Sequence, residues 1–223
     1  SEDAENVGFA IPINIYNSIS KLMLKGDGKL LFQPSIGCVF YNSNDDIINF
    51  YGCGKKCKSG VVIKSIMDKS ELRDKGIESG DILCNIGGHD IDNFSECKVD
   101  WNMEKVPLSS IIERYKVDEK VKMKFWSSKK EKLIEINIKI KSSDTIYPLR
   151  LKYPPFEDID WEIFGGIVMV ELTLNHIENI PFLIEYIKPE KRNTQKIIIT
   201  QIYPGSSLSK FSILSPGSIV NKI

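Results

Sequence analysis

Short β-type runs separated by glycine-containing turns are the feature that most limits what this chain can fold into. Between residues 35 and 141 these runs hold only a few residues each, and in the last two of them apolar and polar side chains alternate. That pattern is typical of strands that bury one face. The strands we expect here are residues 37–41, 60–66, 82–86, 121–126 and 133–140.

Two helices are expected within the same stretch. Residues 70–75 fit a short helix that Gly76 ends, and a second helix follows Pro107. The apolar residues of the second helix follow the i, i+3, i+4, i+7 spacing of one helix face. These residues are Leu108, Ile111, Ile112 and Tyr115. The fold class expected for residues 34–143 is therefore α+β, mainly β with short helices.

An amphipathic helix is expected before this unit. Residues 14–25 carry an apolar stripe at helical spacing, and Asn14 is a suitable N-cap. Glycines at 26 and 28 end the helix, and Pro34 biases its predecessor toward extended backbone. Residues 13–33 are therefore expected to be a linker made of a helix and a loop.

A second, shorter cycle of the same parts begins near Trp161, after a proline-bearing stretch (144–160) that we expect to be a stiff linker. The matched runs are 164–170 with 37–41, 196–202 with 61–66, and 215–221 with 78–85. Parts that recur in one order indicate two copies of one fold. The second copy, at 161–223, is expected to be incomplete, because a groove helix and closing strands are missing from it.

The charge balance argues against nucleic acid as the main partner. The chain has 30 Lys and Arg against 30 Asp and Glu, so its formal net charge is zero. Phosphate binding needs a surplus of basic side chains. No apolar run is long enough to span a bilayer, so no membrane span is expected.

The five cysteines are an odd number in a chain of 223 residues, which favours free thiols in a reducing intracellular compartment or organelle. Cys53 and Cys57 could join His89 or Cys84 in a zinc site, but the spacing of structural zinc sites is not met. A surface loop with free thiols at Cys53 and Cys57 is the better prediction, with Cys38 and Cys84 as small core residues. No metal and no cofactor are expected.

The motifs of residues 35–83 resemble the PDZ domains of HtrA/DegP-type serine proteases. Ser35-Ile36-Gly37-Cys38 is similar to their carboxylate-binding loop. The other matching runs follow in the family's order and are Gly60–Ile63, Ser70–Leu72 and Lys75–Leu83. Ser70-Glu71-Leu72 departs from the usual Ser-Pro-Ala, and Ser218 stands where the second copy should have aspartate. The resemblance implies a PDZ-like, partly open β-barrel in two tandem copies.

The N-terminal run Asn6–Pro12 resembles the last strand of the trypsin-like domain in the same family. The whole chain is most similar to the Do-like (Deg) branch of plants, algae and protists, in which that domain precedes two PDZ domains. The implied domains are the end of the protease domain (1–12), the linker (13–33), the first PDZ domain (34–143), the proline-rich linker (144–160) and a truncated PDZ-like domain (161–223).

A serine-protease triad cannot be assembled from these residues. Trypsin-like hydrolysis needs a serine nucleophile, a histidine base and an aspartate. His89 and His176 are the two histidines, and neither lies near a Gly-x-Ser-Gly-Gly-type loop. In the resembled family the triad precedes the strand at 6–12, so no catalytic residue is expected in this chain. A homologue with a degenerate triad would fit the same residues.

Peptide capture by strand addition is the activity that these residues support. The edge strand would begin at Cys38, and backbone amides around Gly37 could hold a terminal carboxylate. The helix after Pro107 would form the other wall, with Ile111 and Ile112 mainly in the core. A bulky residue at Gly37 is expected to abolish binding and leave the fold intact. The predicted peptide-binding residues are Ile36, Gly37, Cys38, Val39, Phe40, Ser109, Ile112 and Tyr115.

Two functions are compatible with this pattern. The leading hypothesis is the regulatory and substrate-binding PDZ region of an HtrA/Deg-type serine endopeptidase in protein quality control. It would capture hydrophobic or unfolded segments and C-termini, relay docking to its own protease domain, and form a homo-oligomer. The alternative is a stand-alone PDZ adaptor without catalytic activity. The run at 8–12 favours the first, because an adaptor would leave Phe9 and Ile11 exposed.

Overall fold

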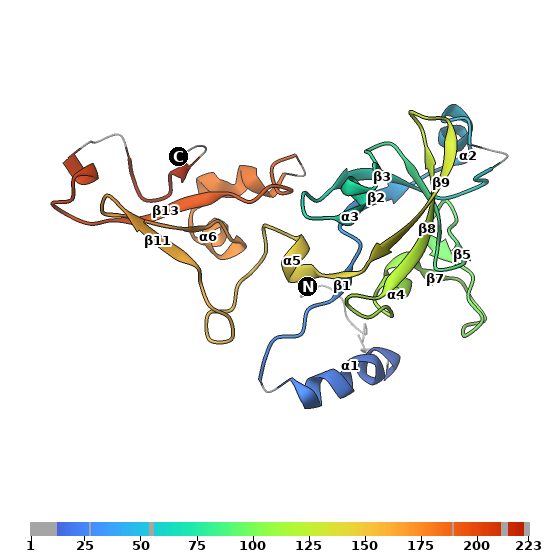
Figure 1. Cartoon of the computed structure of the whole chain (residues 1–223), viewed down its shortest axis with the longest axis horizontal. Coiled ribbons are helices and arrows are strands. Elements are labelled where there is room, and N and C mark those ends of the chain that lie inside the picture. Colours follow the sequence, from blue (N-terminus) through green and yellow to red (C-terminus); the bar gives the residue numbers. More distant parts are fainter. Residues whose placement is uncertain (1–12, 27, 54–55, 189, 211–213, 221–223) are drawn as a thin grey trace, which may run out of the picture.

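The computed structural model describes residues 13–26, 28–53, 56–188, 190–210 and 214–220 (Figure 1). The strand predicted to end a protease domain, at 1–12, lies outside these residues. The described chain is mainly β with short helices, and its strands form open sheets. Within these ranges no sheet closes into a barrel. None of the described helices has the length and apolar character needed to cross a membrane.

The elements before residue 147 are α1 (Ile13–Lys25), β1 (Pro34–Ser35), β2 (Cys38–Asn42), α2 (Asp45–Phe50), β3 (Val61–Ile66), α3 (Glu71–Asp74), β4 (Ile82–Ile86), β5 (His89–Asp90), β6 (Glu96–Cys97), β7 (Val106–Pro107), α4 (Leu108–Ile112), β8 (Lys120–Ser127), β9 (Lys132–Lys139), β10 (Lys141–Ser142) and α5 (Ser143–Ile146). Those after it are β11 (Trp161–Phe164), β12 (Ile167–Glu171), α6 (Leu174–Asn179), the 3-10 helix η1 (Pro181–Ile187), β13 (Ile197–Ile202), the 3-10 helix η2 (Leu208–Lys210) and β14 (Ile219–Val220).

The first sheet has the order β2-β3-β4-β8-β9, with β5 paired to β4, and all of its pairs are antiparallel. The β4–β5 turn is Gly87-Gly88, with φ of 59° and 92°. Two successive positive φ values are what a tight hairpin of this kind requires, and glycine adopts them without strain. The sheet ends at β2 on one side and at β9 on the other.

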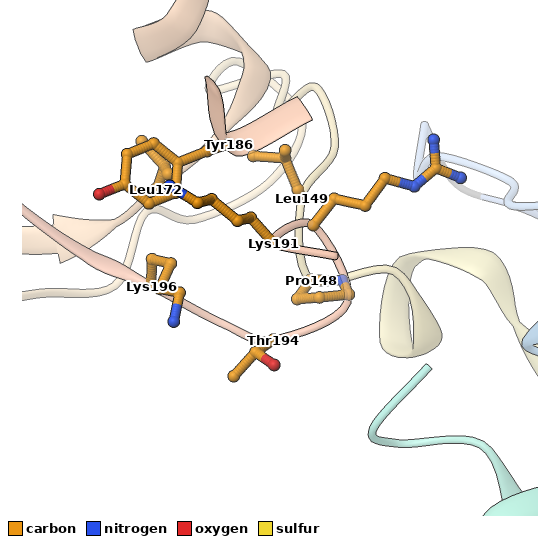
Figure 2. A pocket seen from close by; sticks show the side chains of 8 residues that line it. Pro148, Leu149, Leu172, Tyr186, Lys191, Thr194 and Lys196 are labelled. Carbon is orange, nitrogen blue, oxygen red and sulfur yellow. The ribbon is translucent and has the colours of Figure 1, made fainter. Parts of the chain in front are cut away.

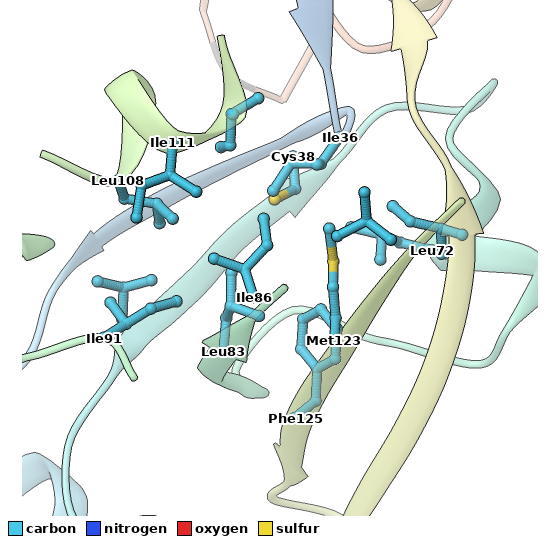
Figure 3. Close-up of a cluster of buried hydrophobic side chains, with 14 of the residues drawn as sticks. Ile36, Cys38, Leu72, Leu83, Ile86, Ile91, Leu108, Ile111, Met123 and Phe125 are labelled. Carbon is cyan, nitrogen blue, oxygen red and sulfur yellow. The ribbon is translucent and has the colours of Figure 1, made fainter. Parts of the chain in front are cut away.

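One hydrophobic core fills the interior between this sheet and its helices. Side chains from β2, β4, β8 and α4 point into the same space (Figure 3), and Leu83, Ile86, Met123 and Phe125 are completely buried. A smaller cluster lies around Trp126, whose indole N–H donates to the Tyr51 carbonyl at 2.7 Å. Burial of large apolar side chains is the main stabilising term of such a unit.

The second sheet has the order β11-β12-β13-β14 and is also antiparallel throughout. Its core contains Val170, Leu172, Ile177, Leu183 and Ile198. None of the β11 residues belongs to that core, and all four are exposed. Figure 1 shows β11 as the outer arm of a hairpin with the strand that follows it.

The segment that joins the two sheets packs against the second sheet and against the chain before β1. Leu149 lies against the core of the second sheet, and the Lys152 amide donates to Asn175 Oδ1 at 2.9 Å. The Arg150 guanidinium pairs with Glu157 and lies 5.0 Å from the Phe32 ring centroid. Much of this proline-rich stretch is therefore fixed by contacts, in addition to the stiffness expected from its prolines.

The element boundaries differ in places from the sequence-based expectations. The helix after Pro107 is shorter than predicted, because it ends at Ile112. The run at 164–170, which matches 37–41 in the sequence, contains the end of one strand and most of the next. Phe164 belongs to β11, and Gly165-Gly166 is a hairpin turn with φ of 59° and 88°. The alternation of apolar residues around two glycines fits a hairpin as well as a strand.

The prediction of free thiols at Cys57 and Cys84 is wrong. These two residues form a disulfide with a Cα–Cα distance of 5.9 Å and a sequence separation of 27. Cys53 is not a surface thiol either, since it is fully buried. An odd cysteine count cannot reveal one pairing among five residues, because the pairing depends on which strands lie together. The cysteine pattern therefore no longer supports a reducing compartment.

Thiol titration tests this pairing. In denaturant without reductant we expect three reactive thiols, from Cys38, Cys53 and Cys97. After reduction all five cysteines should react. Reduction should also lower the free energy of unfolding by about 3–4 kcal/mol, because a loop of this length is released in the unfolded chain. Five reactive thiols before reduction would contradict the pairing.

A buried carboxylate fixes the turn before β4. Asp81 is 2% exposed; its Oδ2 accepts from the Glu78 amide at 2.9 Å and its Oδ1 from the Ser128 amide at 3.0 Å. The first bond closes the turn, and the second ties this turn to the residue after β8. Hydrogen bonds to a charged acceptor are among the stronger ones in proteins.

Replacement of Asp81 with alanine should lower the free energy of unfolding by about 2–3 kcal/mol, because two amide donors lose a charged acceptor. Urea titration followed by tryptophan fluorescence measures this, since Trp126 is buried in the same unit. Asp74→Ala is the matched control, because Asp74 is exposed. Equal losses in the two variants would show that the buried carboxylate is not needed.

Candidate peptide-binding site

A glycine turn precedes β2. Gly37 has φ +70°, and its carbonyl accepts a hydrogen bond from the Met67 amide at 2.9 Å. A Cβ at this position would lie 2.7 Å from Ser70 Cβ and 3.0 Å from Ile146 Cγ2. The turn therefore requires glycine for two reasons, the positive φ and the close approach of Ser70. Residues 35–38 are all buried.

The amide of Gly37 already has an acceptor. It donates to Ser35 Oγ at 3.1 Å, and the Ser35 hydroxyl donates in turn to Tyr147 Oη at 3.1 Å. The Ile36 carbonyl accepts from Ser70 Oγ at 2.8 Å. A terminal carboxylate could take the Gly37 amide only if the Ser35 hydroxyl turned away. The Gly37 amide is therefore already satisfied, and a ligand would have to compete for it.

The edge of the first sheet is at β2. The Gly37 carbonyl points toward the β3 side, where it accepts from the Met67 amide. In an antiparallel strand the backbone N–H and C=O groups of successive residues point to opposite sides. Cys38 therefore presents its amide and carbonyl to the outer side, where none of the strands in the described ranges pairs with it. Burial raises the pKa of the Cys38 thiol to about 12, so this side chain is a neutral core group. Val39 and Phe40 are half-buried beside it.

The helix α4 supplies the neighbouring wall only in part. Ile111 and Ile112 are buried in the core, which confirms their core assignment, and Ser109 is exposed. Tyr115 follows the helix and packs on the β4–β5 turn, because a Cβ on Gly87 would lie 1.9 Å from its hydroxyl oxygen. The structure thus brings Ile36, Cys38 and Phe40 together with Ile112 in or around one core, and Tyr115 packs against the same core.

The segment that leaves the first sheet covers the back of the glycine turn. Strand β10 pairs with β1, and the Ser143 amide donates to the Gln33 carbonyl at 2.8 Å. Ile146 at the end of α5 is buried next to Gly37. The chain entering the unit and the chain leaving it therefore meet directly behind the candidate site.

The turn before β12 in the second sheet repeats these contacts. Gly166 has φ +88°, and its carbonyl accepts from the Tyr203 amide at 2.8 Å. A Cβ on Gly166 would lie 2.1 Å from Ser206 Cβ. In both sheets the strand after the glycine pairs with the next strand through a register shift at its second and third residues.

The turns before β4 and before β14 also make matching hydrogen bonds. The Ile63 amide donates to the Asp81 carbonyl at 2.8 Å, and the Ile199 amide donates to the Ser218 carbonyl at 2.9 Å. The Ser218 hydroxyl accepts from the Ser215 amide at 3.4 Å, in the place of the Asp81 carboxylate. The matched pairs are Gly37 with Gly166, Met67 with Tyr203, Ser70 with Ser206, Ile63 with Ile199, and Asp81 with Ser218.

The two histidines occupy other positions. His89 lies in β5, and the ring of His176 caps α6, where its Nδ1 accepts from the Thr173 amide at 3.1 Å. Burial lowers the pKa of His176, which favours this neutral acceptor state. Among the residues that the structure covers, no group of three His, Cys, Asp or Glu side chains could hold a metal ion.

Two cavities lie against the second sheet. The smaller, of about 10 Å³, lies where Leu149 faces Tyr186 (Figure 2), and it has room for one water at most. The larger, of about 260 Å³, is lined by Lys152, Pro154, Ile159, Asp160, Val170, Glu171, Thr173, Asn175, His176 and Thr200. Neither is lined by residues of β2 or α4. Strand addition uses a sheet edge and needs no enclosed cavity.

Comparisons with known proteins give a low-identity homology to HtrA/DegP-type proteases. The chain is 27% identical over 138 residues to a probable periplasmic serine endoprotease, DegP-like, from Marinomonas sp. (strain MWYL1). The match covers 62% of this chain and 26% of the relative, so the chain spans about a quarter of the curated protein that it matches. No protein-family model matches the chain.

Solved structures similar to this chain include two HtrA-type proteases. They are AlgW with a decapeptide, at a TM-score of 0.44, and a serine-to-alanine variant of AlgW with a decapeptide, at 0.46. Each is 12% identical and covers 62% of this chain, and the shares of the solved chains covered are 38% and 37%.

A stability comparison at two glycines tests the close approach at the turn before β2. The expectation that a larger residue at Gly37 leaves the fold intact conflicts with the 2.7 Å contact to Ser70. Gly52 shares φ +70° but has no atom within 4 Å of an added Cβ. Gly52→Ala should cost about 1 kcal/mol for the backbone conformation alone. Gly37→Ala should cost a further 1–3 kcal/mol, roughly, from overpacking. Equal melting temperatures in the two variants would contradict the close approach.

Proposed function

We propose that this chain is the PDZ-type, peptide-binding region of an HtrA/DegP-type serine protease. In this proposal residues 34–143 form a first PDZ domain, and residues 161–223 form a second, truncated PDZ-like domain. The low-identity homology supports the family, and the matched hydrogen bonds of the two sheets support two copies of one fold. The proteolytic activity would belong to a domain outside this chain.

The observation that carries the binding function is the open edge of β2 next to the Gly37 turn. Cys38 directs a backbone donor and acceptor to that edge, and the exposed Ser109 lies in the first turn of α4 beside it. An extended peptide would add to β2 as a strand, with main-chain hydrogen bonds supplying the affinity. The half-buried Val39 and Phe40 would favour hydrophobic segments or C-termini, which suits the recognition of unfolded protein.

The contacts behind the turn suggest how docking would be relayed. A ligand carboxylate that takes the Gly37 amide displaces the Ser35 hydroxyl, which now joins that amide to Tyr147. Tyr147 lies directly after α5, and β1 pairs with β10 at the same place. Docking would therefore loosen the contact between the chain arriving from the linker helix α1 and the chain leaving toward the second sheet. Through this linker the signal would reach the protease domain, in a homo-oligomer of the kind that the resemblance implies.

Hydrogen exchange with a hydrophobic peptide tests the binding site. A peptide with an aliphatic C-terminus is expected to slow amide exchange in residues 38–42, because it would pair with the free edge. Ser109→Trp should weaken its binding about tenfold, or ~1.4 kcal/mol, by narrowing access to that edge. Lys120→Trp is the matched control, since Lys120 is exposed at the start of β8, away from the β2 edge of the sheet.

The outcome that would contradict the proposal is unchanged exchange at 38–42 in the presence of excess peptide. Equal affinity in the Ser109 and Lys120 variants would leave peptide binding in place but would remove α4 from the site.

A further inference from the structure

The outer side of β2 in the first sheet is unpaired among the described strands, whereas the corresponding side of β12 in the second sheet is paired with another strand. Strand β12 follows Gly166 as β2 follows Gly37, with the same bonds to the next strand. At β2 the outer side has no partner among the described strands. At β12 the corresponding side is paired over four residues with β11. The chain therefore reaches two equivalent turns by different routes, from β1 in one case and from β11 in the other.

The position of β11 is that of an added peptide strand. It runs antiparallel to β12, and its last residue, Phe164, lies opposite Ile167, the first residue of β12. A peptide whose C-terminal end approaches the Gly37 turn would run along β2 in the same direction and register. The backbone that continues from Phe164 forms the glycine turn itself, so this occupant is an internal segment rather than a free C-terminus.

The β11 strand contributes little else to the second sheet. Its residues are absent from the core, and Trp161, Ile163 and Phe164 are 58%, 46% and 68% exposed. The strand is therefore held mainly by its backbone pairing with β12. Because none of its residues is in the core, β11 can be released without loss of core contacts. Core packing supplies most of the stability of such a unit, so most of that stability would remain.

We propose that β11 is an intramolecular occupant of a second peptide-binding edge, which is the edge of β12. The inference rests on the proposed function for the β2 edge. In the absence of ligand the β2 edge is unpaired among the described strands, whereas the β12 edge is paired with β11. It also indicates the ligand class: an extended segment like Trp161-Glu162-Ile163-Phe164, with an aromatic residue next to the turn. A free peptide would bind there only in exchange for β11.

Two proline variants of the full chain test this. Phe164 and Ile167 close the two-residue hairpin, so alternation makes Glu162 face β12 and Ile163 face the free side. Glu162→Pro removes an amide that pairs with β12, whereas Ile163→Pro removes one that does not. The probe is a synthetic peptide with the sequence of residues 159–164 and a free carboxylate, and the readout is hydrogen exchange in residues 167–171.

With Glu162→Pro we expect exchange in 167–171 to rise about tenfold and the added peptide to reverse the rise. Wild type and Ile163→Pro should show neither effect. The proposal is wrong if the peptide fails to restore protection in Glu162→Pro, or if it protects 167–171 equally in wild type. It is also wrong if Glu162→Pro raises exchange throughout 197–202, because β11 would then be a structural strand of the sheet. Exchange in 38–42 reports on the proposed function separately, so the two can fail independently.

Discussion

The close approach of Gly37 to Ser70 is the contact on which the first sheet depends. It places the chain under the first turn of α3, orients the Gly37 carbonyl toward the Met67 amide, and so determines where β2 begins. Only a residue without a side chain permits both the approach and the positive φ. Once β2 is positioned, its inner side pairs with β3 and its outer side remains available. The same contact recurs between Gly166 and Ser206, which explains why two segments of different sequence reach the same hydrogen bonds.

The contacts around this turn also suggest how binding and signalling could share a few atoms. The Ser35 hydroxyl satisfies the Gly37 amide while the site is empty and at the same time bonds to Tyr147. A buried amide needs an acceptor, so some group must always occupy that place. In the proposed function a ligand carboxylate replaces the hydroxyl, and the contact with Tyr147 changes as a direct consequence. In the second sheet the corresponding edge, on β12, is paired with β11. The two sheets therefore differ in whether a described segment of the chain itself pairs with this edge.

Much of the fold could be predicted from residue patterns, and specific errors show where such patterns stop. Short apolar runs located β3 and β4, and alternating runs located β8 and β9, all to within a residue or two, because both patterns leave a clear local signal. The core role of Ile111 and Ile112 was likewise readable from helical spacing. The Cys57–Cys84 disulfide was missed, since five cysteines leave the pairing open until β4 and the loop before β3 lie together. Strand β11 was missed because its exposed residues carry no burial pattern, and the packing of Tyr115 on Gly87 left no local signal in the sequence.

The sequence by itself determined the class of fold, the order of strands and turns, and the glycines at which the chain must turn. These are local properties, decided by side-chain periodicity and by backbone angles that only some residues adopt. The tertiary structure decided which edges are open, which amides already have acceptors, and which cysteines pair. Those outcomes depend on segments far apart in the chain, such as Ser35 with Tyr147 or Gly166 with Ser206. They could not be read from the sequence because a hydrogen bond or a steric contact exists only after folding has brought its two partners together.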